Sequence, residues 1–137
     1  MLLRFGTQSG SYIYVDKMDD TTTRPAVLYS HIFHATSRRG RCMTFWYHLN
    51  ERFNGSLVFS VRELDNSGNS NSSGKEHLLW RLDSEHQLPD ADLRNTWAFG
   101  SFGFYTPLSY EILIMGFSAE PVSIVALDDL FFRESVY

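Results

Sequence analysis

The sequence predicts an all-β fold, an antiparallel sandwich of two sheets. Two observations lead to this prediction. Apolar and polar residues alternate along most of the apolar segments, whereas the periodicity of an amphipathic helix is weak nearly everywhere. Seven or eight short alternating segments are separated by turn signals, with no helical pattern between them, and this organisation is typical of a β-sandwich.

The first alternating segments lie in the N-terminal part of the chain. In GSYIYVD, two tyrosines share one side of the predicted strand, and Ile13 and Val15 share the other. The following segment, PAVLYSHIF, alternates less regularly. It is rich in β-branched and aromatic residues, which favour strands.

The segment RCMTFWYHLN at 41–50 divides into two sets of alternate residues. The apolar set is predicted to face the core and consists of Met43, Phe45, Tyr47 and Leu49. The set on the opposite face consists of Cys42, Thr44, Trp46 and His48. The short polar connection NERFNG follows, and it predicts a turn between adjacent antiparallel strands.

The second half of the chain continues the pattern. In GSLVFSVREL, three apolar residues share one face: Leu57, Phe59 and Val61. The Ser-, Asn- and Gly-rich segment at 65–76 has too little apolar area to be buried and is predicted to be an exposed loop. Further strands are predicted in HLLWRL, TWAFGSFGFY, SYEILIMGF and PVSIVALDDLFFRESVY. In SYEILIMGF, one face carries Tyr110, Ile112 and Ile114.

Composition excludes several classes of protein. A chain of 137 residues predicts a single domain, and its aromatic share of 15% favours a packed core. The net charge of −4 with interspersed signs argues against a nucleic-acid partner. No apolar run is long enough to cross a bilayer, so we expect no membrane contact by this domain itself. The start, MLLRFGTQSG, has too short an apolar run to be a secretion signal, so either the chain is intracellular or its leader lies outside this sequence.

No catalytic constellation is evident. Cys42 and His48 share a strand face, but six residues of extended chain separate them by about 20 Å. The sequence contains no G-x-S-x-G motif and no evident pair of facing carboxylates. His31 and His34 are three residues apart, which on a strand sends them to opposite faces and argues against zinc. We therefore predict a non-enzyme without a catalytic residue or cofactor.

Asp128 and Asp129 interrupt an apolar strand. One of the two is predicted to point towards the core side or a cavity at its edge, where a carboxylate needs hydrogen bonds, a cation or a metal ion. Carboxylate oxygens are ligands that Ca²⁺ prefers, so a calcium site is one interpretation. The alternative is a carboxylate bonded to backbone N–H groups or paired with an arginine.

Three further features concern modification. Asn54-Gly55-Ser56 and Asn71-Ser72-Ser73 are glycosylation sequons in polar segments, which favours a secreted protein. The basic run Arg38 to Arg41 is either a turn before a strand or a protease site, and we favour the turn. A single cysteine is a buried apolar side chain in most cytosolic proteins, but in a secreted protein it suggests a missing partner or an intermolecular link.

The order and spacing of these segments resemble the MAM domain of meprins, neuropilins and receptor tyrosine phosphatases. The resemblance runs from about Gly10 to Phe132. It is carried by Trp97 and by GSYIYVD, AVLYS, CMTFWYHLN, GSLVFSVRE, LLW, YEILIMGF and IVALDDLFF. It implies one domain at 1–137 with a jelly-roll-like β-sandwich, and before Gly10 the family's first strand and cysteine pair are not recognisable.

The resemblance also implies roles for single residues. In related domains the counterpart of Cys42 forms a disulfide with a cysteine shortly after the final strand, so the expected partner of Cys42 lies outside this chain. Some relatives bind a cation near the Asp-Asp strand, which implies Ca²⁺ at Asp128 and Asp129.

The family acts in adhesion and oligomerisation in extracellular regions. The resemblance therefore implies a non-catalytic interaction module of a larger cell-surface or secreted protein, with a protein partner that includes a second copy of the chain. The alternative is a glycan-binding jelly roll, which exposed Trp or Tyr side chains beside carboxylates would favour.

Overall fold

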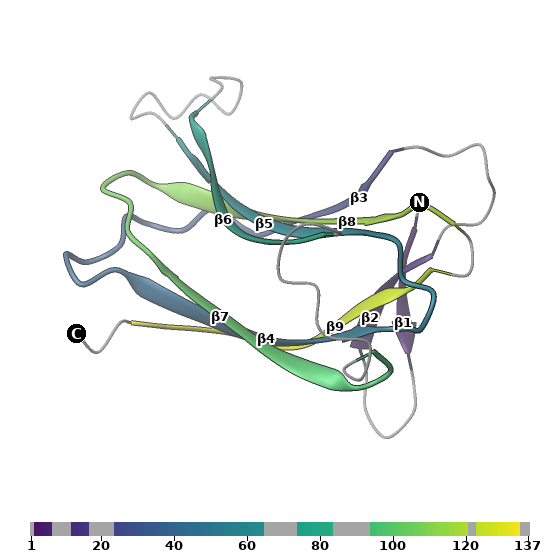
Figure 1. Cartoon of the computed structure of the whole chain (residues 1–137). Coiled ribbons are helices and arrows are strands. Elements are labelled where there is room, and N and C mark those ends of the chain that lie inside the picture. The colour runs from purple at the N-terminus through teal and green to yellow at the C-terminus, as the bar shows by residue number, and fades with distance from the viewer. Residues whose placement is uncertain are drawn as a thin grey trace.

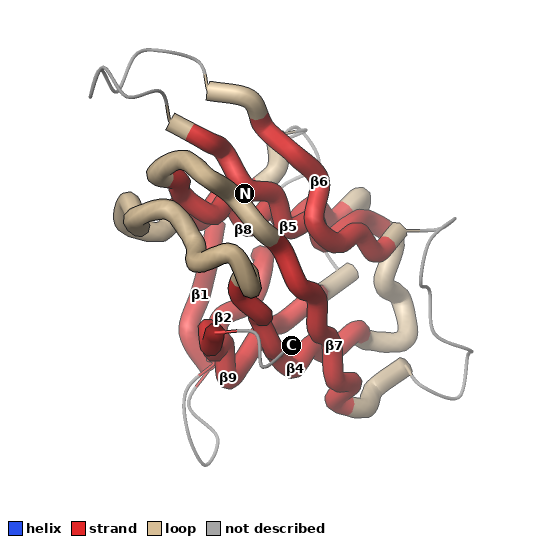
Figure 2. Tube along the Cα trace, turned by 90° about the vertical axis from the view of Figure 1, so that its left-hand side faces the viewer, coloured by secondary structure: helices blue, strands red, loops and turns tan. Residues whose placement is uncertain are grey.

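The protein is a sandwich of two antiparallel β-sheets (Figure 1). The computed structural model describes residues 2–6, 12–16, 24–64, 74–83, 94–120 and 123–134. The strands in these ranges are β1 Leu2–Gly6, β2 Tyr12–Asp16, β3 Ala26–Tyr29, β4 Arg41–Leu49, β5 Gly55–Glu63, β6 Glu76–Leu82, β7 Trp97–Phe104, β8 Tyr110–Ser118 and β9 Val125–Glu134. The same ranges contain strands and loops without a helix (Figure 2), so none of these residues belongs to a helix that could span a membrane.

One sheet has five strands in the order β1-β2-β9-β4-β7, and the other has four in the order β3-β8-β5-β6. All pairings are antiparallel. The all-β, two-sheet fold predicted from the alternating pattern is therefore confirmed. Figure 1 shows β6 and β7 as edge strands on the same side of the sandwich.

The connection between β4 and β5 corrects one sequence-based prediction. The segment 50–55 was predicted to be a turn between adjacent strands of one sheet, but β4 lies in the five-stranded sheet and β5 in the four-stranded sheet. The chain therefore crosses between the layers here. Phe53 lies in this crossing and is 4% exposed, so an apolar side chain of the connection closes that end of the core.

One further strand and two strand limits also differ from the sequence-based prediction. Residues Leu2–Gly6 form β1, an edge strand that was not predicted. β3 ends at Tyr29, after which Phe33 forms only an isolated bridge to Tyr110. β9 begins at Val125. The limits of short apolar strands are decided by their pairing with neighbouring strands. The local sequence does not contain this information.

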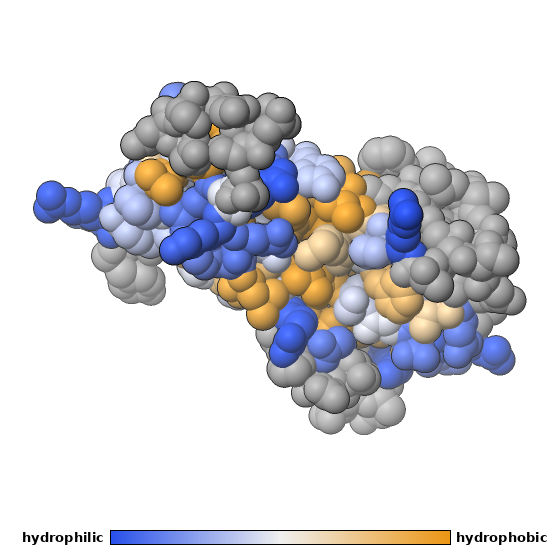
Figure 3. Space-filling model, turned by 90° about the horizontal axis from the view of Figure 1, so that it is seen from above, coloured by the Kyte–Doolittle hydropathy of each residue, from blue (hydrophilic) through white to orange (hydrophobic). Residues whose placement is uncertain are grey.

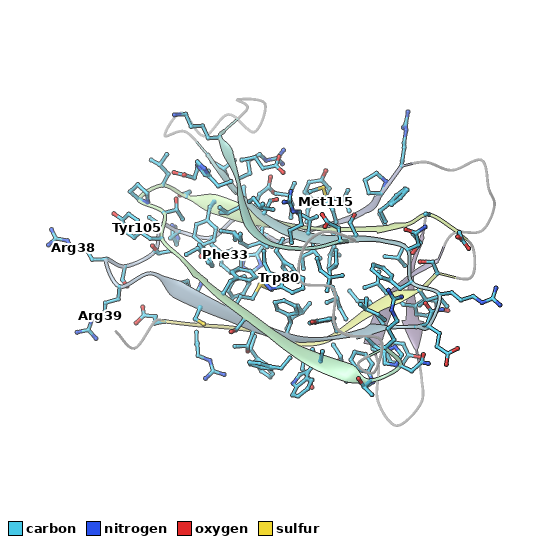
Figure 4. All side chains as sticks on the ribbon, in the orientation of Figure 1. Phe33, Arg38, Arg39, Trp80, Tyr105 and Met115 are labelled. Atoms are coloured by element: carbon cyan, nitrogen blue, oxygen red, sulfur yellow. The ribbon has the colours of Figure 1, made fainter. Side chains whose placement is uncertain are left out.

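The core is built from the alternate apolar residues that the sequence indicated. The predicted core faces of β4, β5 and β8 are all buried between the sheets. At its centre Phe45 is fully buried, with its ring centroid 4.4 Å from that of Phe59 and 5.0 Å from that of Trp80. Figure 4 shows Trp80 between the two layers. Stacked and edge-to-face aromatic pairs of this kind stabilise a core beyond the apolar area they bury.

Candidate interaction surface

The outer face of the five-stranded sheet carries a group of aromatic side chains. Across the sheet, His48 on β4 is opposite Trp97 on β7 and Ala126 on β9, and Trp46 is opposite Phe99 and Asp128. Directly opposite residues of antiparallel strands point to the same side of the sheet. We call the following set the aromatic face: Tyr12, Trp46, His48, Trp97, Phe99 and Phe131.

Two pairs of rings in the aromatic face contact each other edge to face. The ring centroids of Trp46 and Phe99 are 5.3 Å apart with an interplanar angle of 64°. Those of Tyr12 and Trp97 are 5.7 Å apart at 75°, although two strands separate β2 from β7. Ala126 lies in one of the intervening strands and is only 4% exposed. Because its side chain is small, the two large rings can meet across the sheet.

The aromatic face is exposed as well as apolar. Trp46 and Trp97 are each 40% exposed, Phe99 is 56% and Phe131 is 59%. These four are half of the eight large hydrophobic side chains exposed among the described residues. Large exposed apolar side chains gathered on one face of a sheet mark an interaction site more often than scattered single residues do.

The outer face of the other sheet provides a comparison. Val27, Met115 and Val58 form one row across β3, β8 and β5, and Figure 3 shows hydrophobic residues between hydrophilic ones on this face. These three side chains are only half exposed. Tyr29 and Leu78, at the two edges of the sheet, are the described large hydrophobic residues of this sheet that are exposed, each at 55%. The aromatic face is therefore the stronger candidate.

Asp129 and Leu130 form a β-bulge beside the aromatic face, directly after Asp128. Opposite Phe45 the pairing of β9 with β4 shifts by one residue, and Asp129 has a φ of 51°. The Asp129 N–H donates a hydrogen bond of 2.9 Å to Asp128 Oδ1. Aspartate tolerates this left-handed conformation better than most residues, because its short side chain bonds locally.

The bulge corrects the prediction that one of the two aspartates points towards the core. Leu127 is buried, and the extra residue restores the alternation so that Leu130 and Phe132 again pack against the core. Asp129 is exposed and Asp128 is half-buried on the outer side. Among the described residues, no group of three or more His, Cys, Asp or Glu side chains is arranged to hold a metal ion. The calcium site at these two residues stays a prediction.

Cys42 is a free, half-buried thiol near one end of the same outer face. Its neighbours across the sheet are Gly103 and Arg133, neither of which is a general base, so they do not complete a catalytic pair with the thiol. His48 lies further along β4 and contacts Trp97 instead, with 5.3 Å between ring centroids.

The histidines occupy separate places. His77 Nε2 is 2.8 Å from Glu63 Oε1, where the two residues lie on the adjacent strands β6 and β5. His31 packs against Phe33, and His34 is exposed. His86 lies outside the described residues.

One of the two predicted sequons can be located. Asn54 is exposed directly before β5, and its backbone is held by Ser123: the Asn54 N–H donates to Ser123 Oγ at 2.7 Å. The side chain of Asn54 is therefore accessible on a backbone that is fixed. Asn71 lies outside the described residues.

The basic run Arg38 to Arg41 forms a turn, as we favoured. The Gly40 N–H donates to the Ser37 carbonyl at 2.9 Å, and Gly40 has a φ of 78°. A side chain at Gly40 would meet the Phe104 carbonyl oxygen, so both its conformation and the available space require glycine. Figure 4 shows Arg38 and Arg39 pointing away from the sheets, whereas Arg41 lies over the rings of Phe33 and Phe132.

Sequence reasoning placed Trp46 and His48 opposite the core, but it did not identify the aromatic face. The remaining members of the aromatic face lie on three other strands. The order of the strands in the sheet decides which of these residues become neighbours. The available signal was the pair of alternate aromatic residues Trp97 and Phe99, which precede a core residue of the other phase, Phe102.

Similarity to solved structures is limited to the fold. The chain matches a cleaved adhesin domain of Lys-gingipain from Porphyromonas gingivalis at 14% identity and a TM-score of 0.58, covering 90% of this chain and 74% of that one. It matches the xylan-binding CBM22-1 domain from Paenibacillus barcinonensis at 12% identity and a TM-score of 0.57, covering 98% and 81%. At these identities the matches support a jelly-roll-like sandwich.

A family model gives a more specific result. The model described as "MAM domain, meprin/A5/mu" matches residues 3–135, and so includes β1 except for Leu2, as well as the strands that carried the resemblance. MAM domains are generally non-catalytic interaction modules and are typically extracellular. The chain belongs to the MAM domain family.

Proposed function

We propose that this chain is a single domain, residues 1–137, of a larger cell-surface or secreted protein. In this proposal it binds a protein partner through the aromatic face and takes no part in catalysis. The single observation that carries the proposal is the exposure of Trp46, Trp97, Phe99 and Phe131 on one face of the five-stranded sheet. Large aromatic side chains lose little conformational entropy on binding, which is why they dominate protein interfaces.

The packing of the rings favours a protein partner over a sugar. A sugar ring stacks on the broad face of an aromatic side chain. In the aromatic face, Trp97 contacts the ring of Tyr12 at 75°, and Trp46 contacts that of Phe99 at 64°. The rings therefore form an uneven surface that suits interdigitating side chains, as in the centre of a protein interface.

The experiment compares two faces of the same sandwich. We would screen the chain against a panel of extracellular domains, using wild type, a Trp46→Ser/Phe131→Ser variant and a Tyr29→Ser/Leu78→Ser variant. Each variant removes two large exposed side chains, one pair from the aromatic face and the other from the four-stranded sheet. Circular dichroism and the melting temperature establish that both variants fold.

A partner in the proposed mode loses at least tenfold in affinity with the aromatic-face variant and little with the control, because each truncated interface anchor typically costs 1 kcal/mol or more, about fivefold or more in affinity. Binding that survives the aromatic-face variant and fails with the control would place the interface on the other sheet. A panel without any binder would count against a protein partner.

Glycan binding is the second candidate function. Asp128 is opposite Trp46 in the sheet, which is the combination of aromatic ring and carboxylate that would favour sugar recognition. The solved neighbours include a xylan-binding domain. A glycan array with and without Ca²⁺ tests this candidate: a signal that Trp46→Ala removes supports it, and a silent array contradicts it.

An extracellular location accounts for two further predictions. Asn54 is exposed and would accept a glycan without disturbing a buried contact; Asn71 is proposed as a second acceptor. Cys42 would form a disulfide with a cysteine outside this chain, and we expect such a bond to stabilise the fold by about 2–4 kcal/mol. Mass spectrometry of the secreted parent protein, with and without reduction and glycosidase treatment, tests both modifications.

Calcium at Asp128 and Asp129 can be tested directly. A cation bound by the folded state alone raises the melting temperature as its concentration rises. A rise in 1 mM CaCl₂ relative to EDTA that disappears in Asp128→Asn would support the site. An unchanged melting temperature would leave the two aspartates with their hydrogen bond at the bulge, from the Asp129 N–H to Asp128 Oδ1.

A further inference from the structure

We propose that the edge strand β7 pairs in antiparallel orientation with β7 of a second copy of this chain, joining two five-stranded sheets into one continuous sheet. The inference rests on the proposed interaction function, because it names one partner for it. Its starting observation is that, among the strands that the structure describes, β7 pairs with β4 on one side only and is an outer strand of its sheet. The N–H and C=O groups of alternate residues along such a strand point away from the sheet and are available to another strand.

β7 lacks the features that protect the other edges. Its sequence, WAFGSFGF, contains no charged residue and no proline, and its register with β4 runs over eight residues without a shift. β1 includes Arg4, and β3 has only four residues and follows Pro25. β6 carries charged residues, and its pairing with β5 is interrupted by a bulge. Charge, proline, short length and bulges are the devices by which natural edge strands avoid pairing.

The sequence of β7 is complementary to itself. If two copies meet around Ser101, each aromatic residue of the central segment lies opposite a small one: Phe99 opposite Gly103, Phe102 opposite Gly100, and Phe104 opposite Ala98. In this register, each residue of one copy lies opposite a residue of the other copy whose side chain points to the same face of the sheet. Residues whose backbone N–H and C=O groups point outwards also lie opposite one another, as antiparallel pairing requires. A twofold axis through the centre of β7 would generate this closed dimer.

The space for this arrangement is present on the outer side. A side chain built at Gly103 would contact only the Arg41 carbonyl oxygen, at 3.7 Å, so the partner's Phe99 finds open space above this glycine. Ser101 is exposed between them. The pairing also brings the two aromatic faces side by side, because Phe99 and Trp97 belong to both β7 and that face.

The first experiment measures self-association by sedimentation or light scattering over a concentration series. We expect wild type to dimerise. Ser101→Lys should weaken dimerisation at least tenfold, because it places two like charges opposite each other at the centre of the pairing. Thr44→Lys is the matched control, since Thr44 is the neighbour of Ser101 on β4 and presents the same charge on the same face, one strand in from the edge.

The second experiment does not depend on the lysine variant folding. In a Cys42→Ser background, Ser101→Cys should form a covalent dimer on mild oxidation, because antiparallel neighbours lie within disulfide range. Tyr29→Cys, at an exposed position on the other sheet, should not.

The outcomes separate this inference from the proposed function. A chain that stays monomeric at high concentration overturns the pairing, yet it can still bind another protein through the aromatic face. A dimer that Ser101→Lys leaves intact and Trp46→Ser/Phe131→Ser abolishes also overturns it, since the copies then meet through the aromatic face. A dimer with the opposite sensitivities supports pairing through β7.

Discussion

At the scale of single residues, Asp129 shows how two charged side chains fit into an apolar strand. Its positive φ creates the bulge opposite Phe45, and the bulge keeps both carboxylates out of the core while Leu127 and Leu130 remain on the core side. The sequence-based prediction that one of the two aspartates points towards the core assumed strict alternation along the strand. One extra residue removes that conflict, which is why the aspartates need no buried cation to be accommodated.

We therefore predict different effects on stability for two substitutions at Asp129. Asp129→Gly should stay within about 0.5 kcal/mol of wild type, because glycine adopts positive φ without strain. Asp129→Val should lose about 1–2 kcal/mol, since a β-branched residue is disfavoured there. Urea unfolding measures both. Equal losses in the two variants would show that the carboxylate, and not the backbone conformation, matters at this position.

Tyr47 provides a prediction about pH. Burial raises the pKa of its phenol above the ordinary value of about 10, so the folded state holds the proton more tightly than the unfolded state does. The resulting stability is fully present below pH 10 and is lost as the pH rises towards the folded pKa. The stability of Tyr47→Phe should therefore fall less steeply above pH 10 than that of wild type. Urea midpoints between pH 9 and 11 measure the two curves. Parallel curves would contradict this contribution.

At the scale of elements, β7 combines a face in the core with a face in solvent, and its glycines differ accordingly. A side chain at Gly100 would lie 2.4 Å from Phe45 Cζ, because the fully buried ring of Phe45 occupies the space above this glycine. The outer side of the strand at Gly103 is open. The sequence shows two similar glycines in one strand, and only the opposite strand β4 distinguishes them.

This difference predicts the outcome of a matched pair of substitutions. Gly100→Ala should destabilise the fold by about 1–3 kcal/mol, the typical cost of overpacking a core. Gly103→Ala should be within about 0.5 kcal/mol of wild type. Thermal unfolding of the two variants gives the comparison. A larger loss at Gly103 would mean that something other than the strand β4 approaches this position.

The elements themselves could be predicted to a large extent. The core sets of β4, β5 and β8 follow from a two-residue period, and that period is local information. The sheet membership of β4 and β5 could not be predicted, because a short polar connection is compatible both with a hairpin and with a crossing between layers. β1 was missed since a five-residue segment gains its stability from pairing with β2.

At the scale of the whole molecule, the strands differ in how extensively they pair with neighbouring strands. β4 lies between β9 and β7, and β8 lies between β3 and β5, each with long registers. Among the described residues, β2 pairs with β9 through Ile13 and Tyr14 alone, and β1 pairs only with β2. A small apolar cavity also lies beside β2, lined by residues that include Val15 and Gly116.

Hydrogen exchange should reveal this difference. We expect the amides of β4, β5 and β8 to exchange slowest, close to the rate of global unfolding, and those of β1 and β2 to exchange much faster by local opening. Mass spectrometry of exchanged peptides resolves the two groups. Uniform protection of all strands would show that β1 and β2 unfold only with the whole sandwich.

The sequence by itself determined the fold class, the core faces of the central strands, the absence of an evident catalytic constellation and, through its MAM-like segments, the family. All of these depend on local periodicity or on ordered motifs along the chain. Only the tertiary structure decided that β4 and β5 belong to different sheets, that Asp129 lies in a bulge, and that Tyr12, Trp46, Trp97 and Phe131 share one exposed face. The physical reason is that sheet order and register join residues far apart in the chain, and the pattern within any one strand does not specify its neighbours.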